Sequence, residues 1–346
     1  MTSTSTQLLW TQPQWIDQAQ AWIRQALADA GYTLTAPVEQ FHVQIWSTVM
    51  RCTTQAGTFY FKASYRPTEV LLTQHLRRFQ PENLPDVLAL DGERGWMLMR
   101  DSGAMLRTYL KSPADLHLIE PALVQFASLQ IAASDHPEQF FPLGVADRRL
   151  ERLPDMFSAL LSEAEVLRLG YEDGLSAEEH ERLRSLLPRY REMCSQLQDY
   201  HIPQTLHHDD FHDGNIFVSG EPGRYRFVFS DWEECLVTHP FFSMMLCLRS
   251  VGGRAGFPDE ATEAPEKMPA ELNHLRDVYL EPWRRFESRE RLVEAFNLAW
   301  RVGMVSRALT WREFIVNLED PQRERYAYIV PAWLQEFLLA MKDGAA

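Results

Sequence analysis

Ionisable and amide side chains gather in one short stretch of the chain, residues 206–218. This stretch contains the pattern His-x-Asp-x-x-x-x-Asn, formed by His208, Asp210 and Asn215, and apolar runs flank it. The next apolar run downstream ends close to Asp231. Polar groups on a short loop between strand-like runs are typical of a reactive site that a rigid frame holds in place.

These residue types match the needs of phosphoryl transfer. A carboxylate must orient and deprotonate an attacking hydroxyl group, while an amide oxygen and a second carboxylate hold Mg²⁺ against the phosphates. Asp210, Asn215 and Asp231 fill these three roles in chain order. We therefore predict Asp210 as the catalytic base, and Asn215 and Asp231 as the magnesium ligands.

A transition-metal site is the competing interpretation of the same stretch. His208 and His212 stand four residues apart, as they would on a metal-binding helix. Gly214 and the flanking strand-like runs argue against a helix there, and no Glu lies between the histidines as it does in metal-dependent hydrolases. A metal-dependent hydrolase and a plain solvated turn stay as alternatives.

With the segment Asp231-Trp232-Glu233, the stretch resembles the catalytic and metal-binding loops of the aminoglycoside phosphotransferase family, whose members are small-molecule kinases. The resemblance implies an α+β, bilobal, protein-kinase-like fold, with an antiparallel five-stranded N-lobe and a mainly helical C-lobe. Residues 1–100 would form the N-lobe with a leading helix, and residues 101–346 the C-lobe with the catalytic loop, metal site and substrate cap. A catalytically silent nucleotide-binding or scaffold protein would share this fold.

The resemblance also implies the co-substrates and the type of reaction. ATP or GTP would donate its γ-phosphoryl group, with Mg²⁺ as cofactor, to a small molecule that carries a hydroxyl group. Asp209 is a rival for the base, but only Asp210 keeps the five-residue interval to Asn215. His208 and His212 would brace the loop through hydrogen bonds.

Lys62 is a further candidate functional residue. It follows three aromatic residues of a strand, where an unpaired charge is costly to bury. In the resembled family a lysine of the third strand contacts the nucleotide phosphates, and a glutamate of the next helix steers it; Glu69 begins that helix here. The connection between the two residues is short, so their pairing is open. Alternatively, Lys62 reaches solvent and Glu69 stabilises a helix N-terminus.

The remaining nucleotide contacts are predicted from position alone. Ser47 and Thr48 lie where the family bends over the phosphates between the first two strands, and no glycine-rich loop is present there. Met99 and Arg100 precede the expected hinge between the lobes, where backbone groups would hydrogen-bond a purine base. Main-chain contacts of this kind cannot separate ATP from GTP.

Periodicity predicts the elements that position these residues. Residues 13–30 have helical spacing, residues 38–62 alternate as three antiparallel strands, and two further strands span 84–100. A helix is expected from residue 104. Helices are also expected within 113–133, as a pair within 150–173, and from a capping box at residues 176–179 to about residue 199, where Pro188 would kink or divide the helix.

The last part of the chain is expected to cap the substrate. Residues 250–268 are rich in Gly, Pro and Glu and predict a linker or a lid. Helices near residues 269–283, 291–310 and 321–341 follow. Nothing in this part identifies the acceptor.

Composition limits the partners and the compartment. The chain has 346 residues, enough for two lobes, and a formal net charge of -14, which argues against a nucleic-acid partner and would suit a cationic substrate. No apolar run is long enough to span a bilayer, and residues 1–6 lack the features of a signal peptide, so we expect a cytoplasmic protein without membrane contact. The four cysteines form no Cys-x-x-Cys motif and are expected to be reduced, buried thiols. The oligomeric state is open.

Overall fold

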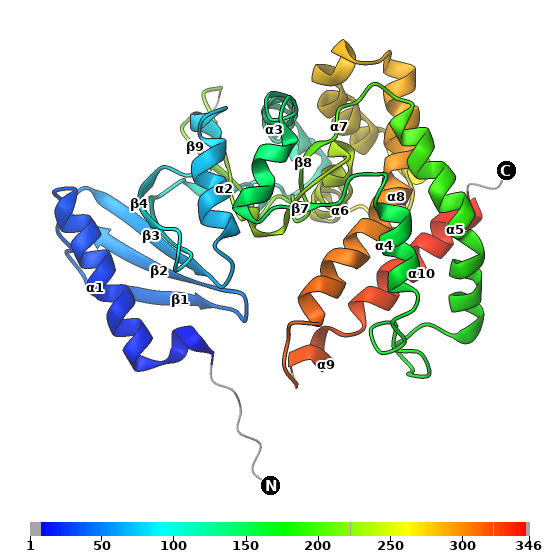
Figure 1. Cartoon of the computed structure of the whole chain (residues 1–346). Helices are drawn as coiled ribbons and strands as arrows, with labels where there is room; N and C mark the ends of the chain where they lie inside the picture. Colours follow the sequence, from blue (N-terminus) through cyan, green and yellow to red (C-terminus); the bar gives the residue numbers. More distant parts are fainter. Residues whose placement is uncertain (1–7, 222, 321, 344–346) are drawn as a thin grey trace, which may run out of the picture. The chain divides into compact units, whose positions relative to one another are not determined.

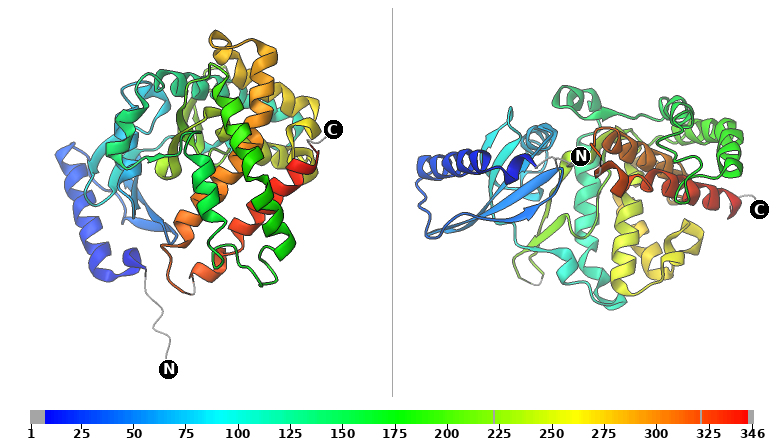
Figure 2. Two further views of the ribbon diagram at one scale, coloured as in Figure 1. Left: turned by 45° about the vertical axis from the view of Figure 1, so that its right-hand side comes forward. Right: turned by 90° about the horizontal axis from the view of Figure 1, so that it is seen from below.

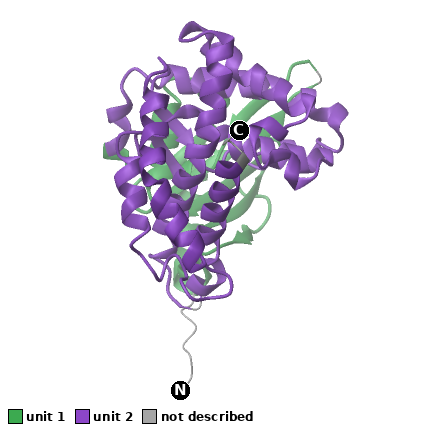
Figure 3. Cartoon of the chain, turned by 90° about the vertical axis from the view of Figure 1, so that its right-hand side faces the viewer, with its two compact units in different colours: residues 1–104, 142–144, 217–233 green, residues 105–141, 145–216, 234–346 purple. Residues whose placement is uncertain are grey.

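The structure is a computed structural model that describes residues 8–343, except residues 222 and 321. Residues 1–6 and Pro321, on which two sequence interpretations depended, therefore lie outside the described residues. The chain forms two compact units, which Figure 3 shows in different colours. Unit 1 comprises residues 1–104, 142–144 and 217–233, and unit 2 comprises the rest. The segment that carries Asp231 thus belongs to unit 1, whereas the sequence-based division at residue 100 grouped it with the second lobe.

Unit 1 contains the predicted five-stranded antiparallel sheet, in the order β1-β2-β3-β5-β4. Each neighbouring pair of strands is antiparallel, and β3 lies in the centre, paired with β2 on one side and β5 on the other. The strands are β1 (Glu39–Val43), β2 (Ser47–Thr54), β3 (Gly57–Ser64), β4 (Val87–Asp91) and β5 (Trp96–Arg100). The fold class and the strand prediction for this region are confirmed.

Helix α1 (Pro13–Asp29) covers one face of this sheet (Figures 1 and 2). Its buried residues recur every four positions and form one apolar stripe that includes Trp15 and Ile23. The ring of Trp15 lies 6.3 Å from that of Phe61 and 5.6 Å from that of Trp96. Burial of each such side chain contributes roughly 1.5–3 kcal/mol, so this stripe is the main link between the helix and the sheet.

The helix expected from residue 104 is wrong. Residues Ala104–Met105 form a short strand, β6, in a three-stranded sheet of order β10-β9-β6, and a 3₁₀ turn follows. The partner strands are β9 (Ile216–Ser219) and β10 (Arg226–Phe229). Gly103 has φ +102° and lies so close to the backbone of Val218 that a side chain would overlap its carbonyl oxygen. Hydrogen bonds between strands therefore take the place of the hydrogen bonds that a helix would have formed along its own backbone.

Unit 2 is mainly helical, with a small sheet of order β7-β11-β8. Its strands are β7 (Ala146–Asp147), β8 (Thr205–His208) and β11 (Cys235–Thr238). Its helices are α3 (Glu120–Ala132), α4 (Leu153–Leu160), α5 (Ala177–Gln198), α6 (Ser243–Ala255), α7 (Ala270–Leu280), α8 (Arg289–Ile315), α9 (Gln322–Tyr326) and α10 (Ile329–Asp343). Helix α2 (Thr68–Leu76) belongs to unit 1.

The centre of unit 2 is helix α8, which packs along α10 (Figure 1). Every residue from Val302 to Thr310 is buried, so this part of the helix has protein on all sides. A charged side chain in this segment must therefore find partners inside the unit. Arg307 is the charged residue of the segment.

Two details of the helical prediction differ from the structure. Helix α5 begins with the predicted capping box, in which Ser176 Oγ accepts a hydrogen bond from the backbone N–H of Glu179. The helix continues through Pro188 undivided. Between residues 150 and 173 only α4 forms, and turns replace the second predicted helix. In the described part of the chain, no helix has the length and apolarity needed to cross a membrane.

All four cysteines are free and buried, as predicted. Burial raises the pKa of the Cys52 thiol and of the Cys194 thiol to about 12, which leaves almost no reactive thiolate at neutral pH. We therefore expect a water-soluble disulfide reagent at pH 8 to modify the native protein far more slowly than the unfolded protein, in which all four thiols should react. Rapid modification of one native thiol would contradict this packing.

Candidate functional site

Unit 1 holds Lys62 between two carboxylates. The Lys62 ammonium nitrogen lies 2.7 Å from Glu69 Oε1 and 2.7 Å from Asp231 Oδ1. The Lys62 side chain is 8% exposed, and Glu69 is almost completely buried. The question that the sequence left open is therefore answered, because the short connection does not prevent Lys62 from pairing with Glu69.

The strands and helices around Lys62 explain how this pairing forms. Lys62 lies in the central strand β3, opposite Val49 of β2 and Met97 of β5. Three residues separate the end of β3 from the start of helix α2, and Glu69 lies in the first turn of this helix. A carboxylate in the first turn also interacts favourably with the helix dipole. Both this interaction and the ion pair with Lys62 therefore stabilise the Glu69 carboxylate.

Electrostatics keep Lys62 charged. Burial alone would lower the pKa of Lys62, but the Asp231 and Glu69 carboxylates outweigh it and hold this pKa above its usual value. The ammonium group is therefore a permanent cation at neutral pH. Replacing Lys62 by a neutral residue would leave the Glu69 and Asp231 carboxylates without a counter-ion.

Asp231 has an unusual backbone conformation. Its φ is +68°, a region that non-glycine residues rarely adopt and that costs of order 1–3 kcal/mol. The following Trp232 is buried and donates its indole N–H to the backbone oxygen of Phe229 at 3.0 Å, which fixes the turn after β10. The Asp231 side chain stays 38% exposed and offers its second oxygen for a further contact.

A third carboxylate, Glu233, completes this cluster. Ser64 Oγ lies 2.8 Å from Glu69 Oε2 and 3.2 Å from Glu233 Oε2. Oxygen atoms of Glu69, Asp231 and Glu233 all lie within 4.8 Å of one another. Hard oxygen ligands of this kind suit Mg²⁺. The sequence predicted no role of its own for Glu233 within the segment Asp231-Trp232-Glu233.

In unit 2, the structure brings the predicted base Asp210 together with Asn215. The Asn215 amide nitrogen donates to the backbone oxygen of Asp210 at 2.9 Å and to its Oδ2 atom at 3.2 Å. The loop that carries both residues follows strand β8, and β8 pairs with β11. Phe211, next to Asp210, is stacked on Phe126 of α3 with ring centroids 3.8 Å apart. Asp210 is therefore held both by Asn215 and by the packing of its neighbour Phe211.

His212 braces the loop, as the sequence predicted. Its Nδ1 atom accepts the backbone N–H of Gly214 at 2.9 Å and lies 2.9 Å from Nη2 of Arg107. Because both of these groups are donors, the ring proton is assigned to Nε2, which lies 3.3 Å from Asp210 Oδ2. His212 thus donates a hydrogen bond to the base.

Asp209 has a structural environment that separates it from Asp210. It is buried, with Oδ1 at 2.8 Å from His207 Nε2 and Oδ2 at 3.2 Å from Arg307 Nη1. Burial would raise the pKa of Asp209, but Arg307 and His207 hold it far below its ordinary value. Both of its oxygens are engaged, so the geometry favours Asp210 over Asp209 as the group that could meet a substrate.

Arg307 is the residue of this region that the sequence did not predict. It extends from α8, and its side chain is 6% exposed. Its Nη1 atom lies 2.5 Å from Glu234 Oε2, and its Nη2 atom lies 3.4 Å from Asp210 Oδ1. No sequence signal links it to the loop, because it follows Asp210 by 97 residues on an otherwise apolar stretch of helix.

The pKa values of the carboxyl groups around Arg307 move in opposite directions. Burial would raise the pKa of Asp210, but the hydrogen bond from His212 and the charge of Arg307 lower it well below its usual range. Burial raises the pKa of the Glu234 carboxyl to about 7, and the neighbouring Asp210 and Asp209 charges add to this effect against Arg307. Asp210 is therefore ionised at neutral pH, as a base must be.

The family model described as the phosphotransferase enzyme family matches residues 67–274, more than half of the chain. The chain belongs to this family. The match includes Glu69, the loop with Asp210 and Asn215, and Asp231. The family assignment made from these motifs is confirmed. Among curated proteins, no match was found.

Solved structures of phosphotransferases have the same fold as this family member. A choline/ethanolamine kinase family protein from Mesorhizobium loti has a TM-score of 0.57 at 18% identity, over 95% of this chain and 99% of that one. Macrolide 2'-phosphotransferase type I has a TM-score of 0.54 at 15% identity, over 91% and 96%. The complex of APH(2")-IIIa with GDP and kanamycin has a TM-score of 0.55 at 12% identity, over 89% and 94%. At these identities the likeness concerns the fold, which is protein-kinase-like as predicted.

In this phosphotransferase family member, the side chains of Ser47 and Thr48 are buried at the start of β2. The Thr48 hydroxyl donates to the backbone oxygen of His42 at 2.7 Å and accepts from the Gln40 amide at 2.8 Å. Its donor capacity is therefore already used within the sheet. Residues 44–46 connect β1 to β2.

Met99 and Arg100 lie in strand β5, as predicted, but the backbone N–H of Arg100 is already engaged within the protein. Its N–H donates to the backbone oxygen of Asp86 at 2.9 Å, and the next N–H, of Asp101, donates to Thr58 at 3.1 Å. The Arg100 side chain bonds the Tyr32 hydroxyl and pairs with Asp86 at 3.2 Å. These contacts fix Arg100 at the end of β5, an inner strand of the sheet.

The transition-metal alternative does not fit the observed geometry. His208 lies in strand β8 and His212 in the following loop, so the two do not share a helix face. Within the described residues, the one group of three or more His, Cys, Asp or Glu side chains able to surround an ion is Glu69, Asp231 and Glu233. That group contains no histidine, whereas the hydrolase interpretation required two.

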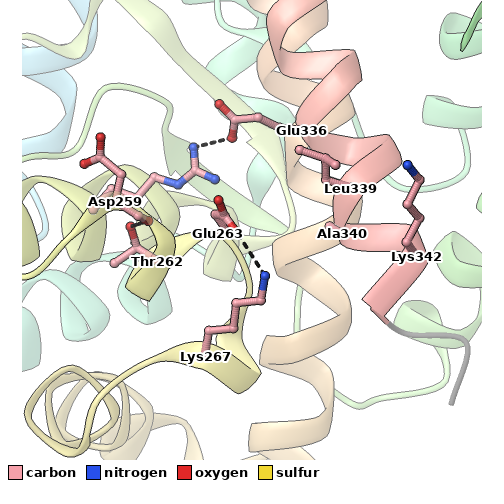
Figure 4. A pocket seen from close by; sticks show the side chains of 9 residues that line it. Asp259, Thr262, Glu263, Lys267, Glu336, Leu339, Ala340 and Lys342 are labelled. Atoms are coloured by element: carbon pink, nitrogen blue, oxygen red, sulfur yellow. Dashed lines mark hydrogen bonds and ion pairs between the residues drawn. The ribbon is translucent and has the colours of Figure 1, made fainter.

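A separate polar cavity lies in the helical unit, between α6, the turns after it, and α10 (Figure 4). Its volume is about 510 Å³. Residues 250–268, predicted as a linker or lid, supply part of its wall in two 3₁₀ turns. Ion pairs Arg249–Glu336 at 2.6 Å and Lys267–Glu263 at 2.8 Å line it. None of the predicted site residues faces this cavity.

Proposed function

We propose that this protein is a nucleotide-dependent small-molecule kinase that transfers a γ-phosphoryl group to a hydroxyl group. The proposal rests on family membership and on one observation above all, the Lys62 ammonium bridging Glu69 and Asp231. A lysine of the third strand, paired with a glutamate of the next helix and close to the metal-binding aspartate, is the arrangement that kinase-type phosphoryl transfer uses.

In the proposed reaction, the acceptor oxygen attacks the γ-phosphorus and forms a new P–O bond. The bond between this phosphorus and the bridging oxygen of the nucleotide breaks, and the electron pair leaves with the nucleoside diphosphate. The hydroxyl proton passes to Asp210. The products are a phosphate monoester and a nucleoside diphosphate, so atoms and charge balance.

Asp210 would act by orientation more than by basicity. Its low pKa makes it a weak base: burial would raise this pKa, but the hydrogen bond from His212 and the charge of Arg307 lower it by more. The transition state of phosphoryl transfer is loose and needs little nucleophile activation, so alignment of the hydroxyl group matters most. A rigidly held carboxylate with an exposed edge supplies that alignment.

The donor set fits Mg²⁺. Asp231 has one oxygen engaged by Lys62 and one left over, and Asn215 uses its amide nitrogen toward Asp210, which leaves its side-chain oxygen as a ligand. We propose these two residues as the magnesium ligands. When bound, the ion neutralises charge on the phosphate oxygens. Lys62 would bind the α- and β-phosphates of ATP or GTP.

The acceptor is proposed to be a small molecule with a hydroxyl group and a positive charge. The structural neighbours include proteins named for choline or ethanolamine, a macrolide and kanamycin. The formal net charge of -14 favours a cation among such compounds. A screen of hydroxyl compounds with ATP and GTP, read as acceptor-dependent release of nucleoside diphosphate, tests the proposal and identifies the nucleotide.

A catalytically silent nucleotide-binding protein is the second candidate, because the buried Thr48 hydroxyl weakens the expected phosphate loop. The two candidates differ in a simple way. A kinase releases nucleoside diphosphate in the presence of its acceptor and loses this activity when Asp210 is replaced. A silent binding protein retains nucleotide binding and shows no turnover with any acceptor.

Replacing Asp231 by asparagine should weaken the use of magnesium. We expect kcat to fall by at least roughly 100-fold, and the Mg²⁺ concentration for half-maximal rate to rise, because a neutral amide is a poorer ligand. Initial rates across a Mg²⁺ titration measure both effects. Asp91→Asn is the matched control, because Asp91 is another aspartate of unit 1 that pairs with a cationic side chain, at 2.6 Å from Arg94. An unchanged Mg²⁺ dependence in Asp231→Asn would remove Asp231 from the metal site.

A further inference from the structure

We propose that Arg307 is the positioning residue of the catalytic base: it holds one oxygen of Asp210 while the loop holds the other. The inference rests on the proposed function, because it assigns a role around the proposed base. It names a residue from helix α8, outside the loop motif and outside residues 67–274. Arg307 touches no reacting atom in this account and acts through Asp210.

The contacts divide the Asp210 carboxylate between two sets of donors. Asn215 Nδ2 and His212 Nε2 lie 3.2 Å and 3.3 Å from Oδ2, and both belong to the loop. Arg307 Nη2 lies 3.4 Å from Oδ1 and comes from the core helix. Donors on a single oxygen would allow the carboxylate to rotate about its last torsion. Donors on both oxygens fix its plane, and with it the direction from which a hydroxyl group is received.

Arg307 is itself held in place by several partners. Its Nη1 atom donates to Glu234 Oε2 at 2.5 Å and to the backbone oxygen of Asp209 at 3.1 Å. Its guanidinium lies over the ring of Trp311, 5.6 Å from the centroid. The guanidinium group is planar, and this many contacts hold it in one orientation. The ammonium group of a flexible lysine side chain would not be held in this way. The bond to the backbone of Asp209 also ties α8 to the residue next to the base.

The negative charges around Arg307 are a second reason why Asp210 needs this residue. Asp209, Asp210 and Glu234 converge on a single guanidinium. Without it, the Asp210 carboxylate would face two neighbouring acidic groups and would turn away from them or take up a proton. Either change would misplace the group that orients the acceptor. An apolar helix segment can hold such an arginine only because these carboxylates surround it.

The experiment compares Arg307→Met and Arg307→Lys with Arg312→Met, using acceptor-dependent nucleoside diphosphate release. Arg312 lies on the same helix and pairs with Glu163 at 2.9 Å, so its replacement controls for loss of an ion pair on α8. Arg307→Met should lower kcat by roughly 100-fold with the nucleotide KM changed less than about threefold, as expected when a reacting group is misplaced. Arg307→Lys should recover part of this loss, and Arg312→Met should have kcat within about threefold of wild type.

A further variant keeps the test decisive if Arg307→Met does not fold. In Arg307→Met/Glu234→Gln, one of the unpaired acidic charges is also removed, so folding should recover, as near-ultraviolet circular dichroism would show, while kcat stays low. A merely structural role predicts the opposite, namely that kcat recovers together with the fold. The inference is overturned if a folded variant without Arg307 has kcat within about threefold of wild type. If wild type and Asp210→Ala have the same rate with every acceptor, the proposed function fails instead.

Discussion

Replacing Asp210 by alanine is expected to lower kcat by roughly 10²–10⁴-fold, the range that a positioned acid or base contributes. The side chain is partly exposed and ionised, and it is held by Asn215, His212 and Arg307. Its removal takes away the carboxylate that we propose receives the acceptor hydroxyl. Nucleotide KM should change little, because Asp210 makes no proposed contact with the nucleotide. Steady-state kinetics with saturating acceptor measure both constants.

Two further variants make this result interpretable. Asp210→Asn keeps the shape of the side chain but loses its charge, so it should be nearly as slow as the alanine variant. Asp155→Ala removes an aspartate of unit 2 that is 78% exposed and pairs with Arg191, and it should be as active as wild type. A rate for Asp210→Ala within threefold of wild type would show that another group serves as the base.

Replacing Lys62 by methionine should affect both stability and nucleotide use. The change leaves the buried Glu69 and the half-buried Asp231 without their shared cation, and breaking a buried pair in this way costs about 3–5 kcal/mol. Chemical denaturation should show a loss of this size in the free energy of unfolding. The nucleotide KM should rise and kcat should fall, because Lys62 is the proposed partner of the phosphates.

The pH dependence of this stability loss has a definite sign. Burial already raises the pKa of Glu69 in the native protein, and the loss of Lys62 removes the main interaction that opposes this rise. A carboxyl group whose pKa is higher in the folded than in the unfolded state stabilises the fold at low pH and loses this contribution as pH rises. The loss in the free energy of unfolding caused by Lys62→Met should therefore be smaller at pH 5 than at pH 8.

The double variant Lys62→Met/Glu69→Gln separates the two effects. With the buried charge of Glu69 removed, most of the stability should return, because no full charge is left unpaired next to the strand. Nucleotide KM should stay as high as in the single variant. If stability does not recover, or if nucleotide KM in Lys62→Met equals that of wild type, the ion pair does not have the role assigned to it.

Local patterns were sufficient where the determining interactions are local. The spacing of apolar residues predicted α1, and alternation predicted the strands that place Lys62 in the middle of the sheet. The loop motif predicted that Asp210 and Asn215 lie together, because they are five residues apart and close one turn. The family resemblance offered Glu69 as a candidate partner of Lys62 and left the pairing open, and only the geometry showed that the short connection permits the ion pair.

Interactions between distant segments could not be predicted in this way. Arg307 reaches the loop from α8, and no local pattern marks an arginine in an apolar helix segment as a partner of Asp210. The strand at Ala104 depends on pairing with β9. A helix predicted from the local sequence cannot take this pairing into account, because β9 lies far along the chain. The Thr48 hydroxyl was expected at a phosphate, whereas the fold uses it to join β2 to the residues before it.

Transfer of label from nucleotide to acceptor tests the central claim most directly. The protein is incubated with magnesium, an acceptor found by the screen, and ATP or GTP labelled at the γ-phosphorus, and the products are separated. We predict that labelled phosphate monoester forms with wild type, in a one-to-one ratio with nucleoside diphosphate, and that Asp210→Ala forms none above background. Nucleotide binding without labelled product, across hydroxyl compounds with and without positive charge, would contradict the assignment of this protein as a kinase.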